Sequence, residues 1–284
     1  MKTIIVPVDF SAASINAVRY AADLAKSPEY EIGRIVLLNS YYVSIYEQIL
    51  PSPELVQVGE QEIREKRAEL KQRLETLKQQ TLQITGPGVS VEPVCSSLPL
   101  LRALLKEIAE KEAILLILGA NTKENSRESD IGEQVIRLAK VSPVPVLIIP
   151  VDKHYSGVSK VLLPCDFKNL ANLAPLKTLQ DADLWLKTKI LVLNVDPALR
   201  RAEPDEKFRE VEQSLDSYLK NITHELYYSD DPDILSGILN FAEDKGVDMI
   251  IALPGKHSFF YSMTHKSISQ HLSINGQMPV LILK

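Results

Sequence analysis

The sequence predicts an α/β protein made of two repeated, doubly wound domains. Each is expected to hold a five-stranded, mainly parallel sheet with helices on both faces. The first observation is an internal repeat, because residues 4–10 (IIVPVDF) return as 161–167 (VLLPCDF), and 145–148 (PVLI) return as 279–282. The second is the alternation of short apolar runs with stretches of helical periodicity, which is typical of buried parallel strands joined by helices.

The repeat is too long for a solenoid unit, which spans roughly 20–50 residues, so each copy is interpreted as a whole small domain. Residues 34–39 and 189–194 match in the same order between the anchors. We expect a first domain at 1–152 and a second at 156–284. The first copy is the longer one, and its extra length falls within residues 47–84.

In the first copy, strands are expected near 3–8, 34–39, 89–95, 114–118 and 145–149, with helices near 12–26, 60–84, 99–111 and 132–141. Ser11 is the expected N-cap of the first helix, since a hydroxyl there can accept from a free backbone N–H. The long helix carries an apolar stripe that includes Leu70, Leu74 and Leu77, with a Glu69–Arg73 pair on its solvent side.

In the second copy, strands are expected near 160–165, 189–194, 223–228, 248–252 and 279–283, with helices near 173–186, 205–221, 232–245 and 266–274. Pro175 stands where the first copy is helical, and an interior proline breaks an α-helix. That helix is therefore expected to begin late, with Asn172 near its cap. Gly246 and Gly276 suit the position just past a helix end.

Composition narrows the class of protein. The net charge of −5 argues against a nucleic-acid partner, which would require clustered Lys and Arg. Two distant cysteines, Cys95 and Cys165, fit neither a disulfide framework nor a zinc site, so a reducing cytoplasm is expected. No signal peptide or membrane span is predicted. No dinucleotide, P-loop, zinc or hydrolase motif is complete, so no catalytic or metal-binding residue is assigned.

The strand order, the VPVDFS segment at the first turn and the closing PVLI strand together resemble the universal stress protein family. The resemblance covers nearly the whole chain, as a tandem pair of such domains. It implies a Rossmann-like fold and a role in the stress response. Members of that family that bind ATP carry G-x2-G-x9-G-[ST] after the fourth strand, where glycines let the backbone approach phosphates and a helix start binds the anion.

The first copy keeps the spacing of this motif but not its residues. Gly119 and Gly132 remain, while the second glycine has become Thr122 and the hydroxyl residue has become Glu133. A carboxylate at a helix start favours the helix and repels a phosphate. Asp9, after the first strand, matches the acid that contacts the nucleotide in the family, although it can equally cap the following helix.

The second copy departs further from the family. Its motif positions are Leu253, Lys256, Lys266 and Ser267, with no glycine among them, and Asp166 stands where the first copy has Asp9. Lys256 and Lys266 make the loop basic and Ser267 opens a predicted helix. An anion could bind here, though not in the backbone-cradled way of the family.

In the family the last strand pairs across a dimer axis, so the resemblance implies an internal pseudo-dimer of the two domains. Residues 144–149 would then lie alongside 278–283, and further pairing of two chains into a homodimer stays open. The leading hypothesis is a non-catalytic regulatory protein with a degenerate nucleotide motif and no cofactor. The alternatives are an ATP-binding protein, with ATP at Asp9, Gly119 and Gly132 and with slow ATPase activity left open, and an enzyme of the adenylate-forming ligase type.

Overall fold

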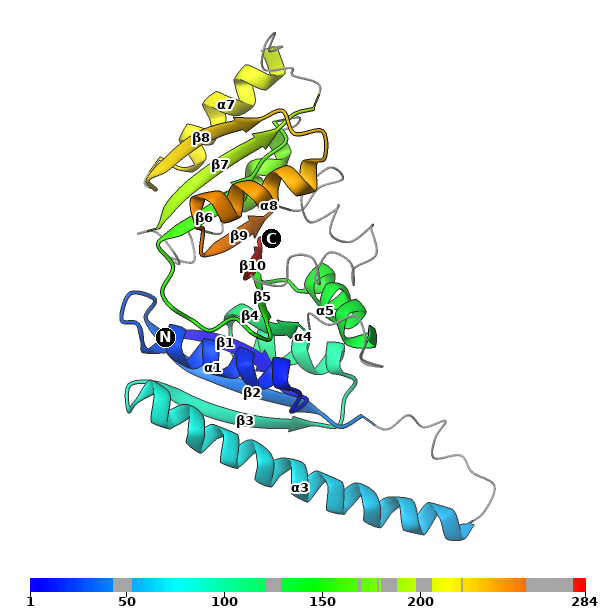
Figure 1. The fold of residues 1–284 in the computed structure, drawn as a ribbon. Helices are drawn as coiled ribbons and strands as arrows, with labels where there is room; N and C mark the ends of the chain where they lie inside the picture. Colours follow the sequence, from blue (N-terminus) through cyan, green and yellow to red (C-terminus); the bar gives the residue numbers. More distant parts are fainter. Residues whose placement is uncertain are drawn as a thin grey trace. The chain divides into compact units, whose positions relative to one another are not determined.

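The computed structural model describes residues 1–42, 53–120, 129–167, 170–177, 179, 188–197, 206–220, 222–253 and 278–284. By the contacts among its residues, the chain divides into two compact units, Met1–Leu118 and Gly119–Lys284. Figure 1 shows the course of the chain through both. The division falls inside one strand, and each unit is an α/β assembly of its own.

The described part of the first unit is built on four parallel strands. They are β1 (Lys2–Pro7), β2 (Ile32–Ser40), β3 (Ser90–Ser96) and β4 (Ala113–Ala120), whose last two residues pass into the second unit. Their order across the sheet is β3-β2-β1-β4. Ile4, Ile5 and Val6 of β1 are fully buried, as a central strand with helices on both faces requires.

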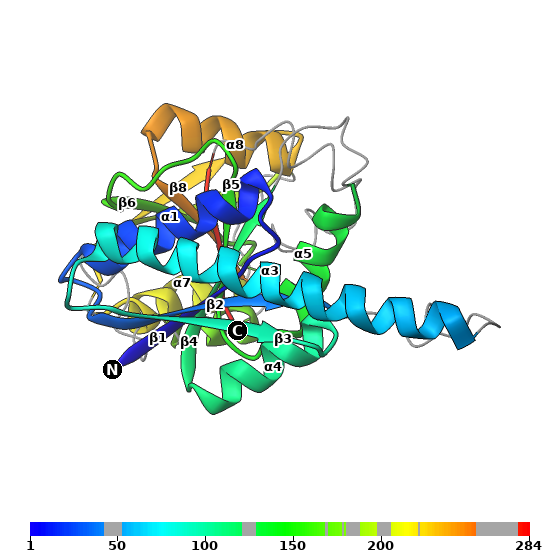
Figure 2. The same ribbon diagram turned by 90° about the horizontal axis from the view of Figure 1, so that it is seen from below.

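Helices cover both faces of this sheet, as Figure 2 shows. Helix α1 (Ala12–Lys26) and helix α3 (Pro53–Thr85) pack against each other on one face, and α4 (Leu100–Glu110) lies on the other. Helix α3 is longer than the predicted 60–84 and runs along β3 with its amino-terminal end extending past the strands. Leu74 and Leu77 are buried, which confirms that part of the predicted stripe.

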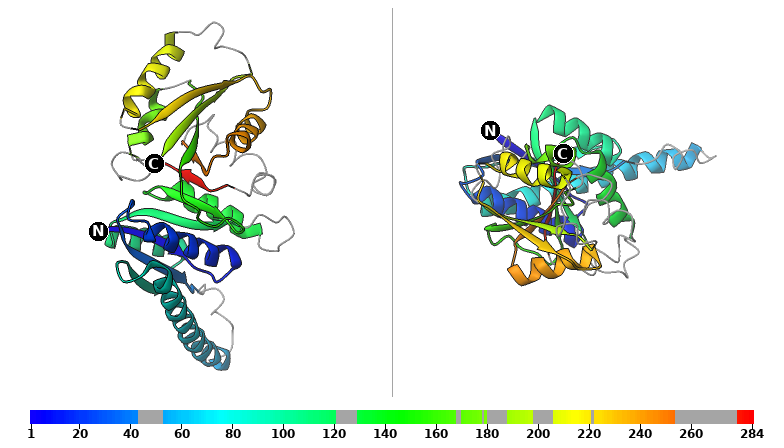
Figure 3. Two further views of the ribbon diagram at one scale, coloured as in Figure 1. Left: turned by 60° about the vertical axis from the view of Figure 1, so that its left-hand side comes forward. Right: turned by 90° about the horizontal axis from the view of Figure 1, so that it is seen from above.

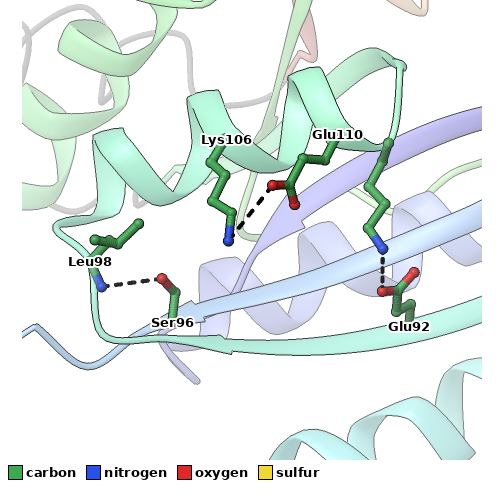
Figure 4. A network of polar contacts seen from close by, with 6 residues as sticks. Glu92, Ser96, Leu98, Lys106 and Glu110 are labelled. Carbon is green, nitrogen blue, oxygen red and sulfur yellow. Dashed lines mark hydrogen bonds and ion pairs between the residues drawn. The ribbon is translucent and has the colours of Figure 1, made fainter.

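Polar contacts lie around α4 and the edge strand β3 (Figure 4). Lys111 Nζ lies 2.5 Å from Glu92 Oε1, and Lys106 pairs with Glu110 one turn along α4 at 3.8 Å. The backbone N–H of Leu98 donates to Ser96 Oγ at 3.2 Å, where the chain turns from β3 into α4. Because both side chains of the Lys106–Glu110 pair are exposed, that ion pair contributes only about 0.2–1 kcal/mol.

The described part of the second unit holds six strands in the order β5-β10-β9-β6-β7-β8. They are β5 (Val146–Pro150), β6 (Lys160–Pro164), β7 (Lys189–Val195), β8 (His224–Ser229), β9 (Met249–Ala252) and β10 (Val280–Ile282). All neighbouring pairs are parallel except β10 with β5, which is antiparallel. The closing strands of the two sequence copies therefore pair directly, with Leu281 opposite Leu147.

Helix α5 (Ser129–Val141) precedes β5, and the remaining helices of this unit lie on the two faces of its sheet (Figure 3, left). Helix α7 (Glu206–Tyr218) packs against the 3-10 helix η1 (Leu170–Leu176) on one face, and α8 (Ile234–Lys245) lies on the other. The fold class predicted from the sequence, α/β with a largely parallel sheet and helices, is confirmed.

One predicted segment differs in the type of helix. Residues 170–176 form a 3-10 helix that contains Pro175, and Asn172 lies inside it rather than at a cap. Residues 177 and 179 are α-helical, as expected of an α-helix that begins late. Proline cannot donate the i→i−4 hydrogen bond, so a short, tighter helix replaces the α-helix here. The predicted helix at 266–274 lies outside the described residues.

Two of the predicted helix ends are confirmed. Ser11 caps α1, and Gly246 ends α8 in the left-handed region at φ 57°.

In the part of the chain that is described, no helix combines the length and apolar character needed to cross a membrane.

Candidate functional site

The turn between β1 and α1 is built by short-range hydrogen bonds from polar side chains. Asp9 Oδ1 accepts from the backbone N–H of Ser11 at 2.9 Å. Ser11 Oγ in turn accepts from the N–H of Ser14 at 3.2 Å, which is the N-cap bond of α1. Aspartate and serine favour such turns because their short side chains reach backbone groups two or three residues away. The helix cap is thus Ser11, and Asp9 fixes the turn before it.

Asp9 is an exposed, ionised carboxylate at the carboxyl end of β1. Partial burial alone would raise its pKa, but hydrogen bonds from Ser11 and Ser14 outweigh burial and hold the pKa below its ordinary value. The group is therefore negative at neutral pH. The carboxylate can accept hydrogen bonds from hydroxyl or amine groups, and its negative charge disfavours direct contact with a phosphate.

The residue that follows each first strand's aspartate has strained backbone geometry. Phe10 has φ 64° and Phe167 has φ 50°. The left-handed region costs a residue with a Cβ roughly 1–2 kcal/mol, and glycine would be the relaxed choice. Strain of this kind persists only where the surroundings enforce it, and it is concentrated at functional turns. Sequence reasoning missed it, although the repeated Asp-Phe pair was its visible sign.

A buried asparagine supports the first turn in each copy. Asn39 Nδ2 donates to the carbonyl of Val8 at 2.7 Å, and Asn194 Nδ2 donates to that of Cys165 at 2.9 Å. Both side chains are buried, and among the described residues neither Oδ1 has a hydrogen-bond partner. These two residues were not predicted. They tie the end of the second strand to the end of the first in both copies.

The structure places the predicted first-copy residues in different units. Asp9 belongs to the first unit, whereas Gly119 is the first residue of the second. Gly132 and Glu133 fall within α5, which begins at Ser129 rather than near 132 as predicted. The first four N–H groups of a helix are the free ones, so Glu133 lies just beyond them. Thr122 lies outside the described residues.

Of the predicted second-copy residues, Leu253 and Asp166 are described. Leu253 is buried directly after β9, and Asp166 follows β6 and is partly exposed. Lys256, Lys266 and Ser267 lie outside the described residues. Within the described ranges no group of three or more His, Cys, Asp or Glu side chains could hold a metal ion.

The surroundings of Asp166 are more apolar than those of Asp9. Phe167 is 3% exposed and contacts Phe208 edge-on, with ring centroids 5.1 Å apart, and Tyr228 at 6.3 Å. Burial raises the pKa of the neighbouring Cys165 thiol to about 12, so that thiol is protonated and unreactive at neutral pH. The second turn is therefore packed as core, while the first is open to solvent.

Parallel strands with helices on both faces and polar turns at the strands' carboxyl ends define a Rossmann-like α/β protein. The model of the universal stress protein family matches residues 1–150, and the chain belongs to that family. None of the curated proteins matches the chain.

Solved structures extend the likeness of fold beyond the first copy. A universal stress protein from Archaeoglobus fulgidus DSM 4304 is 18% identical over 99% of this chain and 96% of its own, with a TM-score of 0.61. A putative universal stress protein from Pseudomonas aeruginosa UCBPP-PA14 is 13% identical over 100% of this chain and 93% of its own, with a TM-score of 0.54. At these identities the likeness concerns the fold alone.

Proposed function

We propose that this chain is a tandem universal stress protein that acts in the cytoplasm as a non-catalytic regulator, with a degenerate nucleotide motif in each copy. In each copy, the protein's own groups already occupy the turn at the carboxyl end of the first strand, and this observation carries the proposal. In the first copy Asp9 is engaged by Ser11 N–H, and in the second Phe167 is packed into an aromatic cluster. The altered motif residues Thr122 and Glu133 also support a degenerate nucleotide motif in the first copy.

The proposed assembly is a pseudo-dimer of the two copies within one chain. Its support is the antiparallel pairing of β5 with β10, in which Val280 lies opposite Ile148 and Ile282 opposite Val146. All residues of both strands are buried. A strand edge covered in this way is not available for pairing with another chain.

The second candidate function is ATP binding in the first copy. It is favoured by Asp9 and by the retained spacing of Gly119 and Gly132. In this reading the Asp9 carboxylate would accept hydrogen bonds from the hydroxyl groups of the sugar. Thr122 and Glu133 weigh against it, because a Cβ hinders close approach of the backbone and a carboxylate repels the anion.

Titration calorimetry with ATP and magnesium tests the proposal. We expect no binding of micromolar affinity by the unmodified protein. Like charges about 4 Å apart repel by roughly 4 kcal/mol at an effective dielectric near 20. Even a third of that weakens binding about tenfold. The double substitution Thr122→Gly with Glu133→Ser is therefore expected to strengthen ATP binding at least about tenfold.

The matched control is the pair of changes at the second copy's motif, Lys256→Gly with Lys266→Ser, which should not create comparable binding. Tight, magnesium-dependent ATP binding by the unmodified chain would contradict the degenerate-site proposal and favour the second candidate.

A further inference from the structure

A cation from the long helix covers the strained turn of the first copy. Arg73 Cζ, on α3, lies 4.0 Å from the centroid of the Phe10 ring. This is well within the roughly 6 Å over which a guanidinium is attracted to an aromatic face. The Arg73 side chain is 49% exposed and also lies 3.8 Å from Glu69, one turn earlier on α3. A solvent-facing arginine therefore holds the ring of the residue next to Asp9.

The second copy holds its equivalent turn by different chemistry. Phe167 packs against Phe208 of α7, the helix that follows the second strand of its copy just as α3 does in the first. Tyr228 of β8 completes the cluster, and its hydroxyl donates to Glu212 of α7. Phe167 is nearly excluded from solvent, whereas Phe10 is only partly buried. The same strained position thus has an apolar clamp in one copy and a cationic clamp in the other.

We propose that Arg73 is a positioning residue of the first-copy site, which acts through Phe10 to hold the left-handed turn that presents Asp9. The ring must stay against α3 for Phe10 to remain at positive φ, because a phenylalanine released from this contact relaxes toward negative φ. The hydrogen bond from the Ser11 N–H to Asp9 spans Phe10, so relaxation of the Phe10 backbone would break it. The role given to Asp9 rests on the proposed function, whereas the clamp itself does not.

The clamp gives the first copy a regulatory property that the second lacks. A cation–π contact at an exposed site is weak, contributing about 0.5–1 kcal/mol. The first turn can therefore open with small changes at α3, including occupation of Arg73 by an anion. The second turn is closed by buried aromatic packing and should be insensitive to such changes.

Amide hydrogen exchange of Ser11, followed by NMR in the full-length chain, tests the clamp directly, because this N–H is bonded to Asp9 Oδ1. We expect Arg73→Ala and Arg73→Met to accelerate exchange about two- to fivefold, and Arg73→Lys to restore most of the protection. Arg73→Met keeps the aliphatic stem, so it separates loss of charge from loss of packing. The matched control is Lys71→Ala, an exposed cation on the same helix, which should leave Ser11 unchanged.

The second copy supplies an internal control. The N–H of Cys165, bonded to Leu193 O at 2.9 Å, should exchange at the same rate in every Arg73 variant. Unchanged Ser11 exchange in Arg73→Ala, or equal acceleration by Lys71→Ala, would overturn the clamp. Tight ATP binding by the unmodified protein would overturn the proposed function and leave this comparison of exchange rates intact.

Discussion

Residues 1–152, prepared as a separate fragment, are expected to self-associate in sedimentation velocity experiments. In the full chain every residue of β5 is buried and the strand pairs with β10. Removing residues beyond 152 removes β10 and leaves an apolar strand edge with unpaired N–H and C=O groups. Such an edge is a template for pairing with another chain. The fragment should form dimers or larger species at concentrations at which the full chain does not.

A fragment that carries Leu147→Lys is the matched control. A charge in the middle of the exposed edge opposes pairing, so this variant should remain closer to a monomer if it stays folded, which circular dichroism can check. A well-behaved monomer of the unmodified fragment would contradict the proposed pairing of the two copies.

Substitution of Asp248 by alanine is expected to lower the free energy of unfolding by about 1–3 kcal/mol at neutral pH. Its Oδ2 accepts three hydrogen bonds, from the N–H of Ser159 at 2.8 Å, the hydroxyl of Ser159 at 2.9 Å and the N–H of Lys160 at 3.0 Å. These bonds hold the start of β6 to the start of β9. Their loss leaves three donors to find other partners, and urea unfolding measures the cost.

The pH dependence of this effect has a definite sign. Burial alone would raise the pKa of Asp248, but donors from Lys160 and Ser159 outweigh it and lower the pKa. A carboxyl whose pKa is lower in the folded state stabilises the fold above its unfolded pKa, about 3.9, and loses that contribution as the pH falls through the folded value. Asp248→Asn keeps an acceptor without the charge, so its deficit in stability should shrink in acid. A deficit that is constant with pH would contradict the charged role.

Much of the fold could be predicted because its signals are local. Apolar runs marked the strands, and Ser11 and Gly246 marked a helix start and a helix end through their own chemistry. Pro175 correctly indicated a broken α-helix but not the 3-10 helix that replaces it, since packing against α7 decides which helical form a short segment adopts. The amino-terminal extension of α3 was missed because the apolar residues used to place the helix, Leu70, Leu74 and Leu77, lie in its carboxyl-terminal half.

The candidate site was less predictable because its supporting contacts are distant in sequence. Asn39 bonds to Val8 across 31 positions, and Arg73 on helix α3 contacts Phe10 in the turn before α1. Asn39 was marked only by its return as Asn194 in the repeat, and nothing near Arg73 distinguishes it from other charged residues on a helix. Asp9 could be named in advance only because the repeat and the family resemblance singled out the turn after the first strand.

The two different clamps on Phe10 and Phe167 have a consequence for inheritance. In an assembly of identical chains, any substitution appears at every equivalent turn at once, so a change that closes one site closes them all. Two copies encoded in one polypeptide escape that rule. Phe208 could arise in one copy without any change at Arg73 in the other. Each turn is therefore free to accumulate substitutions on its own. The molecule thus carries two independently evolvable versions of one ancestral turn.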